Sequence, residues 1–313
     1  MRRQGQVLCQ MQSQMQSQVQ RKERQVLGQM CTKVRTEAKL TRAMWQPRPG
    51  RGTPALDQAT AKRGRASCAR TPAPRGTPAA DAKRMRGGAR ALVNTYRRLA
   101  ETRSHVLEPV LHGATPTQWE HYPSDDAISK DRRYQWYYHS HSPEDRPGSI
   151  EHGHFHLFAR MEGVAELINP EAERRFLCTL GVEESAASTR HLLCIGVNPV
   201  GLPISLFAVN RWVTGDSLLS GTVTQLLLRE LRLDTGYPTI DGWMMALIRL
   251  YAPEIRSLIV QRDRNLRQRA ALGPGTFDDP TLEVLSDCAL DVDQRIAAVS
   301  LPATRRARQP AIS

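Results

Sequence analysis

Two short stretches decide the fold: residues 134–141 read YQWYYHSH, and residues 152–160 read HGHFHLFAR. Both are rich in aromatic residues, as β-strands are. Successive side chains of a strand point to opposite faces, so the alternating histidines of each stretch are expected to share one face. The loop between them, residues 142–151, is short enough to join neighbouring strands. The pair therefore predicts two strands whose histidines lie on one surface.

A second pair of strand-like runs follows at residues 191–197 and 203–210. Between them, residues 198–201 read NPVG, which is a good type I turn sequence. These runs predict a second hairpin. Together with the first pair they predict a small antiparallel sheet of about four strands.

Helical periodicity is found in the sequence before and after these strands. Apolar residues recur about every 3.6 residues, glycines and prolines stand near the expected ends, and Asp241 is placed to cap one helix. Helices at both ends of a central run of strands predict an α+β domain with the helices packed on one face of the sheet. The opposite face is then free to hold a ligand. The expected helices span residues 89–111 (with Pro109 as a potential break), 223–231, 241–251, 253–272 and 291–299.

The start of the chain differs in composition from the rest. Residues 1–88 contain 19 Lys/Arg and 4 Asp/Glu (net +15), and the other 25 and 27 give −2, which accounts for the net charge of +13. Only Trp45 of the 17 Phe, Trp and Tyr residues lies in this segment, and aromatic side chains dominate buried cores. The sequence therefore predicts three parts. They are a disordered basic Gln/Arg/Pro-rich tail at 1–84, a single domain at 85–300 and a disordered C-terminal tail at 301–313.

Three explanations of the basic tail stay open. Translation can begin near Met85, which would make the upstream residues an over-extended reading frame. The tail can be a basic arm that binds nucleic-acid phosphates without sequence preference. It can also be an organelle transit peptide, since it is rich in arginine and poor in acidic residues. Because the domain carries little net charge, nucleic-acid binding is expected only through the tail.

Cysteine spacing and missing motifs exclude several protein classes. Cys178, Cys194 and Cys288 are isolated in the domain, a pattern that suits a reducing cytoplasm better than a disulfide framework. No run approaches the ~18 apolar residues of a membrane span, so we expect a cytoplasmic protein without membrane contact. The phosphate loop, the Gly-x-Gly-x-x-Gly fingerprint, His-Glu-x-x-His and Gly-x-Ser-x-Gly are all absent. These absences argue against four classes of protein: ATPases, Rossmann dehydrogenases, zincins and α/β-hydrolases.

The histidines are the strongest chemical signal. All nine fall between His105 and His191, and five lie within 18 residues: His139, His141, His152, His154 and His156. Strand positions two apart sit ~6.6 Å apart, so a single metal would take one neighbouring pair from each strand. Imidazole and carboxylate ligands suit a divalent zinc, iron, manganese or nickel ion. The expected ligands are His139, His141, His154 and either His152 or His156, with Glu144, Asp145 or Glu151 as a carboxylate alternative.

Two other interpretations use the same residues. The histidines can form a hydrogen-bonded or pH-sensitive polar patch that binds no ion. Residues 152–158 (HGHFHLF) also resemble the histidine-triad signature of nucleotide hydrolases and transferases, although Gly153 replaces the bulkier apolar residue usual there. This resemblance implies a catalytic histidine at His154 that attacks phosphorus, with His152 and His156 beside it.

An arginine after the fourth strand is a second catalytic candidate. Arg211 stands in the segment NRWVTGD at 210–216 and could bind a substrate carboxylate or phosphate through two hydrogen bonds. The alternative is a strand end, with Trp212 in the core and Asp216 capping a turn.

Two more segments have a simpler interpretation. His121 could lie near the other histidines, but a packed Trp119 beside a solvent-facing His121 is the expected arrangement. The arginine-rich run at 262–269 predicts the solvent-exposed face of an amphipathic helix.

Five segments stand out together: residues 119–123, 137–141, 146–148, 151–156 and 210–215. They resemble an uncharacterised bacterial family known only as a domain of unknown function. The resemblance spans about residues 85–299 and implies one intact domain, but no catalytic roles. We expect an α+β protein whose histidine-rich metal centre serves a small-molecule substrate, through an ion that polarises a substrate oxygen or activates water. The alternative is a non-catalytic binding or regulatory module.

Overall fold

The computed structural model describes residues 79–141, 149–184 and 186–300. All of these residues belong to one of the chain's two compact units, Arg63–Ser313. The predicted tails, apart from residues 79–84, and the loop residues Glu144 and Asp145 lie outside the described residues. Within the described part of the chain, no helix combines the length and the apolar composition needed to cross a membrane.

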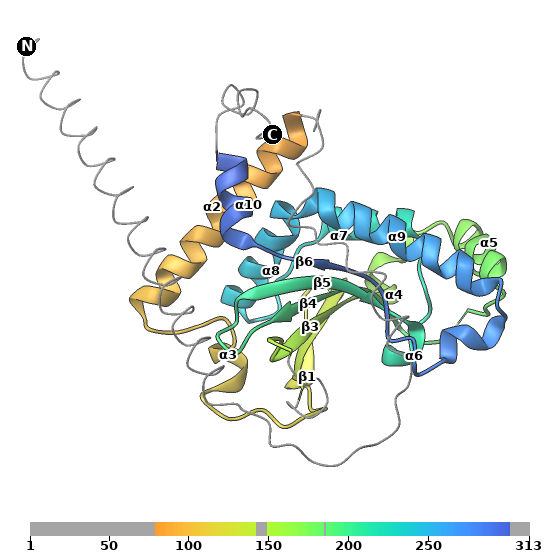
Figure 1. Cartoon of the computed structure of the whole chain (residues 1–313), viewed down its shortest axis with the longest axis horizontal. Coiled ribbons are helices and arrows are strands. Elements are labelled where there is room, and N and C mark those ends of the chain that lie inside the picture. Colours follow the sequence, from red (N-terminus) through yellow and green to blue (C-terminus); the bar gives the residue numbers. More distant parts are fainter. Residues whose placement is uncertain (1–78, 142–148, 185, 301–313) are drawn as a thin grey trace, which may run out of the picture. The chain divides into compact units, whose positions relative to one another are not determined.

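A six-stranded antiparallel sheet forms the centre of the domain (Figure 1). Each strand pairs with the next one in the chain. The strands are β1 (Tyr122–Ile128), β2 (Tyr134–Ser140), β3 (Gly153–Arg160), β4 (Thr189–Val197), β5 (Pro203–Val209) and β6 (Val284–Ala289). The α+β class and the four predicted strands, β2 to β5, are confirmed. The predicted turn between β4 and β5 is also present, with the N–H of Gly201 donating to the carbonyl oxygen of Asn198 at 2.9 Å.

The predicted number of four strands is too low, because the two edge strands lack the alternation of apolar and polar residues by which strands are predicted. The β1 strand reads YPSDDAI and β6 reads VLSDCA, so neither alternates cleanly between apolar and polar residues. In β1 only Ala127 is fully buried. Edge strands often carry such polar residues, which discourage pairing with other chains.

Helices precede and follow the four predicted strands, as expected, but others lie between β3 and β4, and the sixth strand comes after most of the later helices. They are α2 (Ala79–Glu101), α3 (Glu108–Leu111), α4 (Met161–Val164), α5 (Pro170–Leu180), α6 (Arg211–Thr214), α7 (Gly221–Glu230), α8 (Pro238–Leu250), α9 (Ala252–Ala270) and α10 (Val292–Ser300), with 3₁₀ turns η2 (Ala165–Leu167) and η3 (Pro274–Asp278). The single helix predicted at 89–111 is wrong. Arg103 adopts a left-handed conformation (φ 52°) between α2 and α3, and Pro109 lies in the first turn of α3, where proline is tolerated.

The main hydrophobic core lies between the sheet and the helices α2, α7, α8 and α9, which cover the same side of it (Figure 1). Trp136, Phe155 and Leu206 point to this side, and Phe155 packs against Trp243 of α8 with ring centroids 5.4 Å apart. The core helices therefore occupy one face, as predicted.

Asp241 ties α8 to the sheet, and its predicted role as a helix cap is wrong. It lies within α8 and is buried. One carboxylate oxygen accepts a hydrogen bond from Trp136 Nε1 at 3.0 Å, and the other accepts from the N–H of Thr235 at 2.7 Å. These bonds satisfy a charge that would otherwise be costly to bury.

The opposite face of the sheet has a different composition. Because side chains alternate along each strand, the residues next to the core positions, including His154, His156 and Cys194, point to this other side. Cys194 and Phe207 form a separate small apolar cluster there, against which Val213 of α6 packs. His154 and His156 therefore lie on the face away from the core helices.

Candidate metal centre

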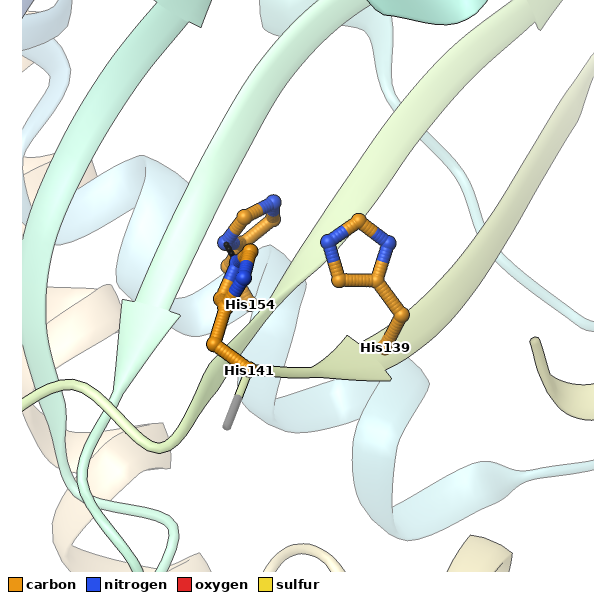
Figure 2. Close-up of side chains that lie close together, drawn as sticks. All are labelled: His139, His141 and His154. Carbon is orange, nitrogen blue, oxygen red and sulfur yellow. Dashed lines mark hydrogen bonds between the residues drawn. The ribbon is translucent and has the colours of Figure 1, made fainter. Parts of the chain in front are cut away.

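His139 and His154 stand opposite each other on the paired strands β2 and β3. Residues directly opposite in an antiparallel pair have their side chains on the same face. His141 follows the end of β2, and its N–H donates to the carbonyl oxygen of His152 at 3.0 Å, which extends the pairing beyond the strand. The side chains of His139, His141 and His154 therefore lie close together (Figure 2).

These three rings form a tight group. The ring centroid of His139 lies 5.0 Å from that of His141 and 4.4 Å from that of His154, and the last two are 4.8 Å apart. One ring nitrogen from each residue lies within 4.8 Å of the other two. His139 and His154 are 8% and 1% exposed, whereas His141 is half-buried. The predicted convergence of imidazoles from two strands is found, and His141 lies on the more open side.

A carboxylate orients the central ring. Nδ1 of His154 lies 2.9 Å from Oε1 of Glu151, and the hydroxyl of Ser205 donates to the other oxygen of that carboxylate at 3.4 Å. Gly196 makes this approach sterically feasible, since a Cβ there would lie 2.7 Å from Glu151 Oε2. Glu151, one of the three predicted carboxylate alternatives, therefore contacts the histidine group.

A cysteine and a further histidine extend the group beyond what the sequence indicated. Cys194 lies opposite His156 on β4, and its sulfur is 3.3 Å from His156 Nδ1 and 3.3 Å from His191 Nε2. His191 reaches this face through a β-bulge: Leu157 pairs with Leu193, but the next residue of β3 pairs with His191. Sequence reasoning missed both residues, because spacing along one strand does not reveal the neighbours across a sheet.

The contacts form one chain of polar atoms across the face. It runs from His191 through Cys194 to His156, then from His156 Nε2 to His154 Nε2 at 2.9 Å, and ends at Glu151. An imidazole can donate at one nitrogen and accept at the other, so successive members can share hydrogens. The cluster can therefore exist without an ion as a hydrogen-bonded network, and its ring nitrogens are already directed at one another.

Burial sets the charge of the inner rings. Desolvation, followed by repulsion from His191 and His139, holds the pKa of His156 well below its ordinary value. Desolvation and the nearby Arg262 lower the pKa of His191 to about 3. Both rings are therefore neutral at neutral pH. A neutral imidazole has the lone pair that a metal ion requires.

Aromatic residues border the open side of the group. Trp119 is 68% exposed, and its ring centroid lies 6.2 Å from that of His139 and 6.2 Å from that of His141, so the prediction of a packed Trp119 is wrong. His121 stacks on Tyr137 with centroids 3.6 Å apart, and Tyr137 stacks in turn on His156 with centroids 4.9 Å apart. His121 is therefore near the group, which was the less expected alternative.

His152 does not join the other histidines. It precedes β3, and its Nδ1 lies 2.6 Å from the hydroxyl of Tyr138, whose ring belongs to the helix-facing core. The expectation that His152, His154 and His156 project together is therefore corrected. Strand alternation applies only within a strand, and β3 begins at Gly153.

The second catalytic candidate, Arg211, is already paired. Its guanidinium donates two hydrogen bonds to Asp278, at 2.9 and 2.5 Å. The neighbouring Trp212 is 36% exposed and donates to the carbonyl oxygen of Leu282, so its predicted place in the core is wrong. Asp216 is buried and accepts a hydrogen bond from Thr189 at 2.6 Å. A substrate anion would have to compete with Asp278 for Arg211, whose catalytic role stays a prediction.

The arginine-rich run is only partly exposed. Arg264, Arg267 and Arg269 face solvent as predicted, but Arg262 is 3% exposed. Its guanidinium donates to Asp263 and to the carbonyl oxygen of Leu219, both at 2.7 Å. Arg262 therefore joins α9 to the residues that precede α7.

A family model described as "Domain of unknown function (DUF6969)" matches residues 86–290. The matched range contains all six strands and every residue of the histidine group, and it agrees with the resemblance expected over residues 85–299. No curated protein and no solved structure matches the chain. Because the matched range covers well over half of the chain, the protein belongs to the family DUF6969, a domain of unknown function.

Proposed function

We propose that the domain holds a divalent metal ion at His139, His141 and His154 and uses it to act on a small-molecule substrate. The observation that carries the proposal is the convergence of three imidazoles, with one nitrogen of each within 4.8 Å of the others. Bringing several rings that can become cationic so close together costs repulsion, and a bound ion removes that cost by occupying their lone pairs.

The distances suit a bound ion. A tetrahedral ion with metal–nitrogen bonds of ~2.0–2.1 Å holds its ligand nitrogens roughly 3.3 Å apart. His141 Nε2 and His154 Nδ1 are 3.2 Å apart, which is close to that separation. One nitrogen of His139 lies within 4.8 Å of both, so its side chain must turn toward the ion. Ion binding therefore requires little movement of the strands.

Glu151 can serve the ion in two ways. Its carboxylate lies against His154 Nδ1, so it can act as a fourth ligand on the side of His141. It can instead stay outside the coordination shell and stabilise the ion through its negative charge, because Nδ1 of His154 has no hydrogen to donate once it binds the ion. Imidazole and carboxylate ligands suit zinc, iron, manganese and nickel.

The half-buried side of the site supports a catalytic role. If Glu151 stays outside the coordination shell, three protein ligands leave a position open for water or a substrate oxygen. The ion would then lower the pKa of bound water or polarise that oxygen. Trp119 offers an exposed indole face beside His139 and His141, which suits a small molecule with an apolar or planar part.

Two other functions make different predictions. In a non-catalytic binding or regulatory module, Glu151 would fill the fourth position and no open site would remain. A histidine-triad enzyme would need His152 and His156 beside a nucleophilic His154, but His152 contacts Tyr138 instead. It would also hydrolyse nucleotide phosphoramidates in the presence of a chelator. The geometry therefore favours the metal site over the triad.

Metal analysis of the full chain tests the proposal. The purified protein is stripped with a chelator, dialysed against zinc, iron(II), manganese or nickel, and analysed for bound metal. We expect tight binding by the wild type and loss of at least ~100-fold in affinity in a His139→Ala/His141→Ala double variant. His105→Ala is the matched control, because this histidine is partly exposed and pairs with Glu108 outside the group.

Circular dichroism must show that all variants keep the wild-type fold. Failure of the stripped wild type to bind any of these ions above the level of the double variant would overturn the proposal. Substrate screening with the loaded protein then separates an enzyme from a binding module.

A further inference from the structure

His154 offers its two ring nitrogens to two different sets of ligands. On one side, Nδ1 lies 3.2 Å from His141 Nε2 and 2.9 Å from the carboxylate of Glu151. On the other side, Nε2 lies 2.9 Å from His156 Nε2. A ring held in this way is suited to bind on both sides at once.

The second set is itself a complete group of metal-binding atoms. His154, His156 and Cys194 each place one such atom within 4.8 Å of the other two, and all three residues are fully buried. His191 Nε2 lies 3.3 Å from the cysteine sulfur and can supply a fourth ligand. A thiolate with imidazoles is a set that zinc binds well.

The two sets differ in ligand type and in access. The outer set, His139, His141 and His154 with Glu151, contains only nitrogen and oxygen donors, and His141 is half-buried. The inner set adds sulfur and is closed to solvent. Closed sites with protein ligands are typical of structural ions, whereas sites with an open position are typical of reactive ones. The arrangement thus provides for two ions with different tasks.

We propose that the site is a two-metal centre in which the imidazole of His154 bridges an outer, reactive ion and an inner, structural ion bound by His156 and Cys194. This inference rests on the proposed function, because the outer ion is the one proposed there. Binding of the inner ion releases two protons to solvent: the remaining N–H proton of His154, which becomes an imidazolate, and the thiol proton of Cys194. No electron transfer is involved.

Bridging requires a local rearrangement of side chains. Cys194 Sγ lies 3.3 Å from His156 Nδ1, the nitrogen on the other side of that ring, so the cysteine must turn toward the ion. The two Nε2 atoms of His154 and His156 are 2.9 Å apart, whereas ligands of one tetrahedral ion lie roughly 3.3 Å apart. The rings must therefore separate by a few tenths of an ångström.

The test counts ions and identifies the thiolate. The full chain is loaded with zinc, and bound metal per chain is compared between the wild type and its variants, so that sites elsewhere in the chain cancel. We expect Cys194→Ser to lose about one ion, His139→Ala/His141→Ala to lose about one, and His154→Ala to lose about two. Loading with cobalt(II) should give a near-ultraviolet thiolate-to-cobalt charge-transfer band that Cys194→Ser abolishes.

Cys178→Ala is the matched control, because Cys178 is an exposed free thiol outside the group and its loss should leave the band unchanged. If Cys194→Ser binds as much zinc as the wild type and keeps the band, the inner ion does not exist. The proposal of an outer ion is not affected by that result. If His154→Ala loses only one ion, the ring is not a bridge. Loss of no metal in any of these variants would overturn the proposed function as well.

Serine has nearly the volume of the buried cysteine, so the Cys194→Ser variant should keep the wild-type fold. Its near-ultraviolet circular dichroism without metal should match that of the wild type. For His154→Ala, the second variant His154→Gln keeps a polar side chain in the pocket and should show the same loss of about two ions. Retention of both ions by a folded His154→Gln protein would contradict the bridge.

Discussion

His154 and Phe155 are neighbours on β3 and are equally buried, yet they lie in two different environments. Phe155 points into the core and packs on Trp136 and Trp243. His154 points to the other face, where its nitrogens meet the other histidines and the carboxylate of Glu151. Apolar packing stabilises the fold, whereas burying polar groups costs free energy unless they are satisfied. One strand therefore places side chains that stabilise the fold on one face and potential metal ligands on the other.

The largest expected effect comes from the core face. Phe155→Ala should lower the free energy of unfolding by ~3–5 kcal/mol, because it removes a fully buried ring and leaves a cavity. In metal-free protein, His154→Ala should cost less, ~1–2 kcal/mol, since burying a polar imidazole stabilises the fold less than burying a phenyl ring and a large part of its contacts are hydrogen bonds. Urea unfolding in the presence of a chelator compares the two. Equal losses would show that the histidine face is a structural part of the core.

Metal should stabilise the domain through the histidine face alone. At a free zinc concentration 100 times the dissociation constant, the free energy of unfolding should rise by ~2.7 kcal/mol, because the ion binds only the folded chain. The increase should persist in Phe155→Ala and become smaller in His139→Ala/His141→Ala, which loses the outer ion. An equal zinc effect in all three proteins, measured by thermal unfolding, would place the ion elsewhere.

Replacing the carboxylate beside His154 tests which side chains of the histidine face contribute to zinc affinity. Glu151→Gln should lower zinc affinity by ~10–100-fold, because the amide lacks the negative charge that attracts the ion and is a weaker ligand. Titration against a zinc indicator measures the change. Glu162→Gln is the control: this exposed carboxylate pairs with Arg132 and Arg160 and has no contact with the histidines. An equal affinity for Glu151→Gln and the control would remove Glu151 from the site.

The smallest effect on stability is expected at the rim. Trp119→Ala should change the free energy of unfolding by less than ~0.5 kcal/mol, because the side chain is mostly exposed. Its indole is nevertheless close to His139 and His141, so binding of cobalt(II) or nickel should quench its fluorescence. The quenching is measured as the difference between the wild type and Trp119→Ala. Identical quenching in both would place the ion far from this residue.

Alternation within the strands predicted the central part of the fold and of the site. The aromatic and histidine patterns of 134–141 and 152–160 predicted β2, β3 and the approach of His139, His141 and His154. Periodicity also predicted most of the helices. These features depend on residues near one another in the chain, which is why the sequence alone reveals them.

The missed features depend on contacts across the sheet or on local irregularities. Cys194 joins the site only through the register of β3 with β4, and His191 only through a bulge in that register. His152 does not join the site, because β3 begins one residue after it. The edge strands β1 and β6 are too polar to show a strand pattern. None of these features has a signal in the spacing of residues along the chain.

X-ray absorption of the zinc-loaded full chain tests most directly whether the histidines hold an ion. We expect a first shell with nitrogen or oxygen atoms at ~2.0–2.1 Å and outer-shell scattering from imidazole rings. Both should weaken strongly in His154→Ala. A first shell made of sulfur alone or of oxygen alone, or a spectrum that His154→Ala leaves unchanged, would contradict it.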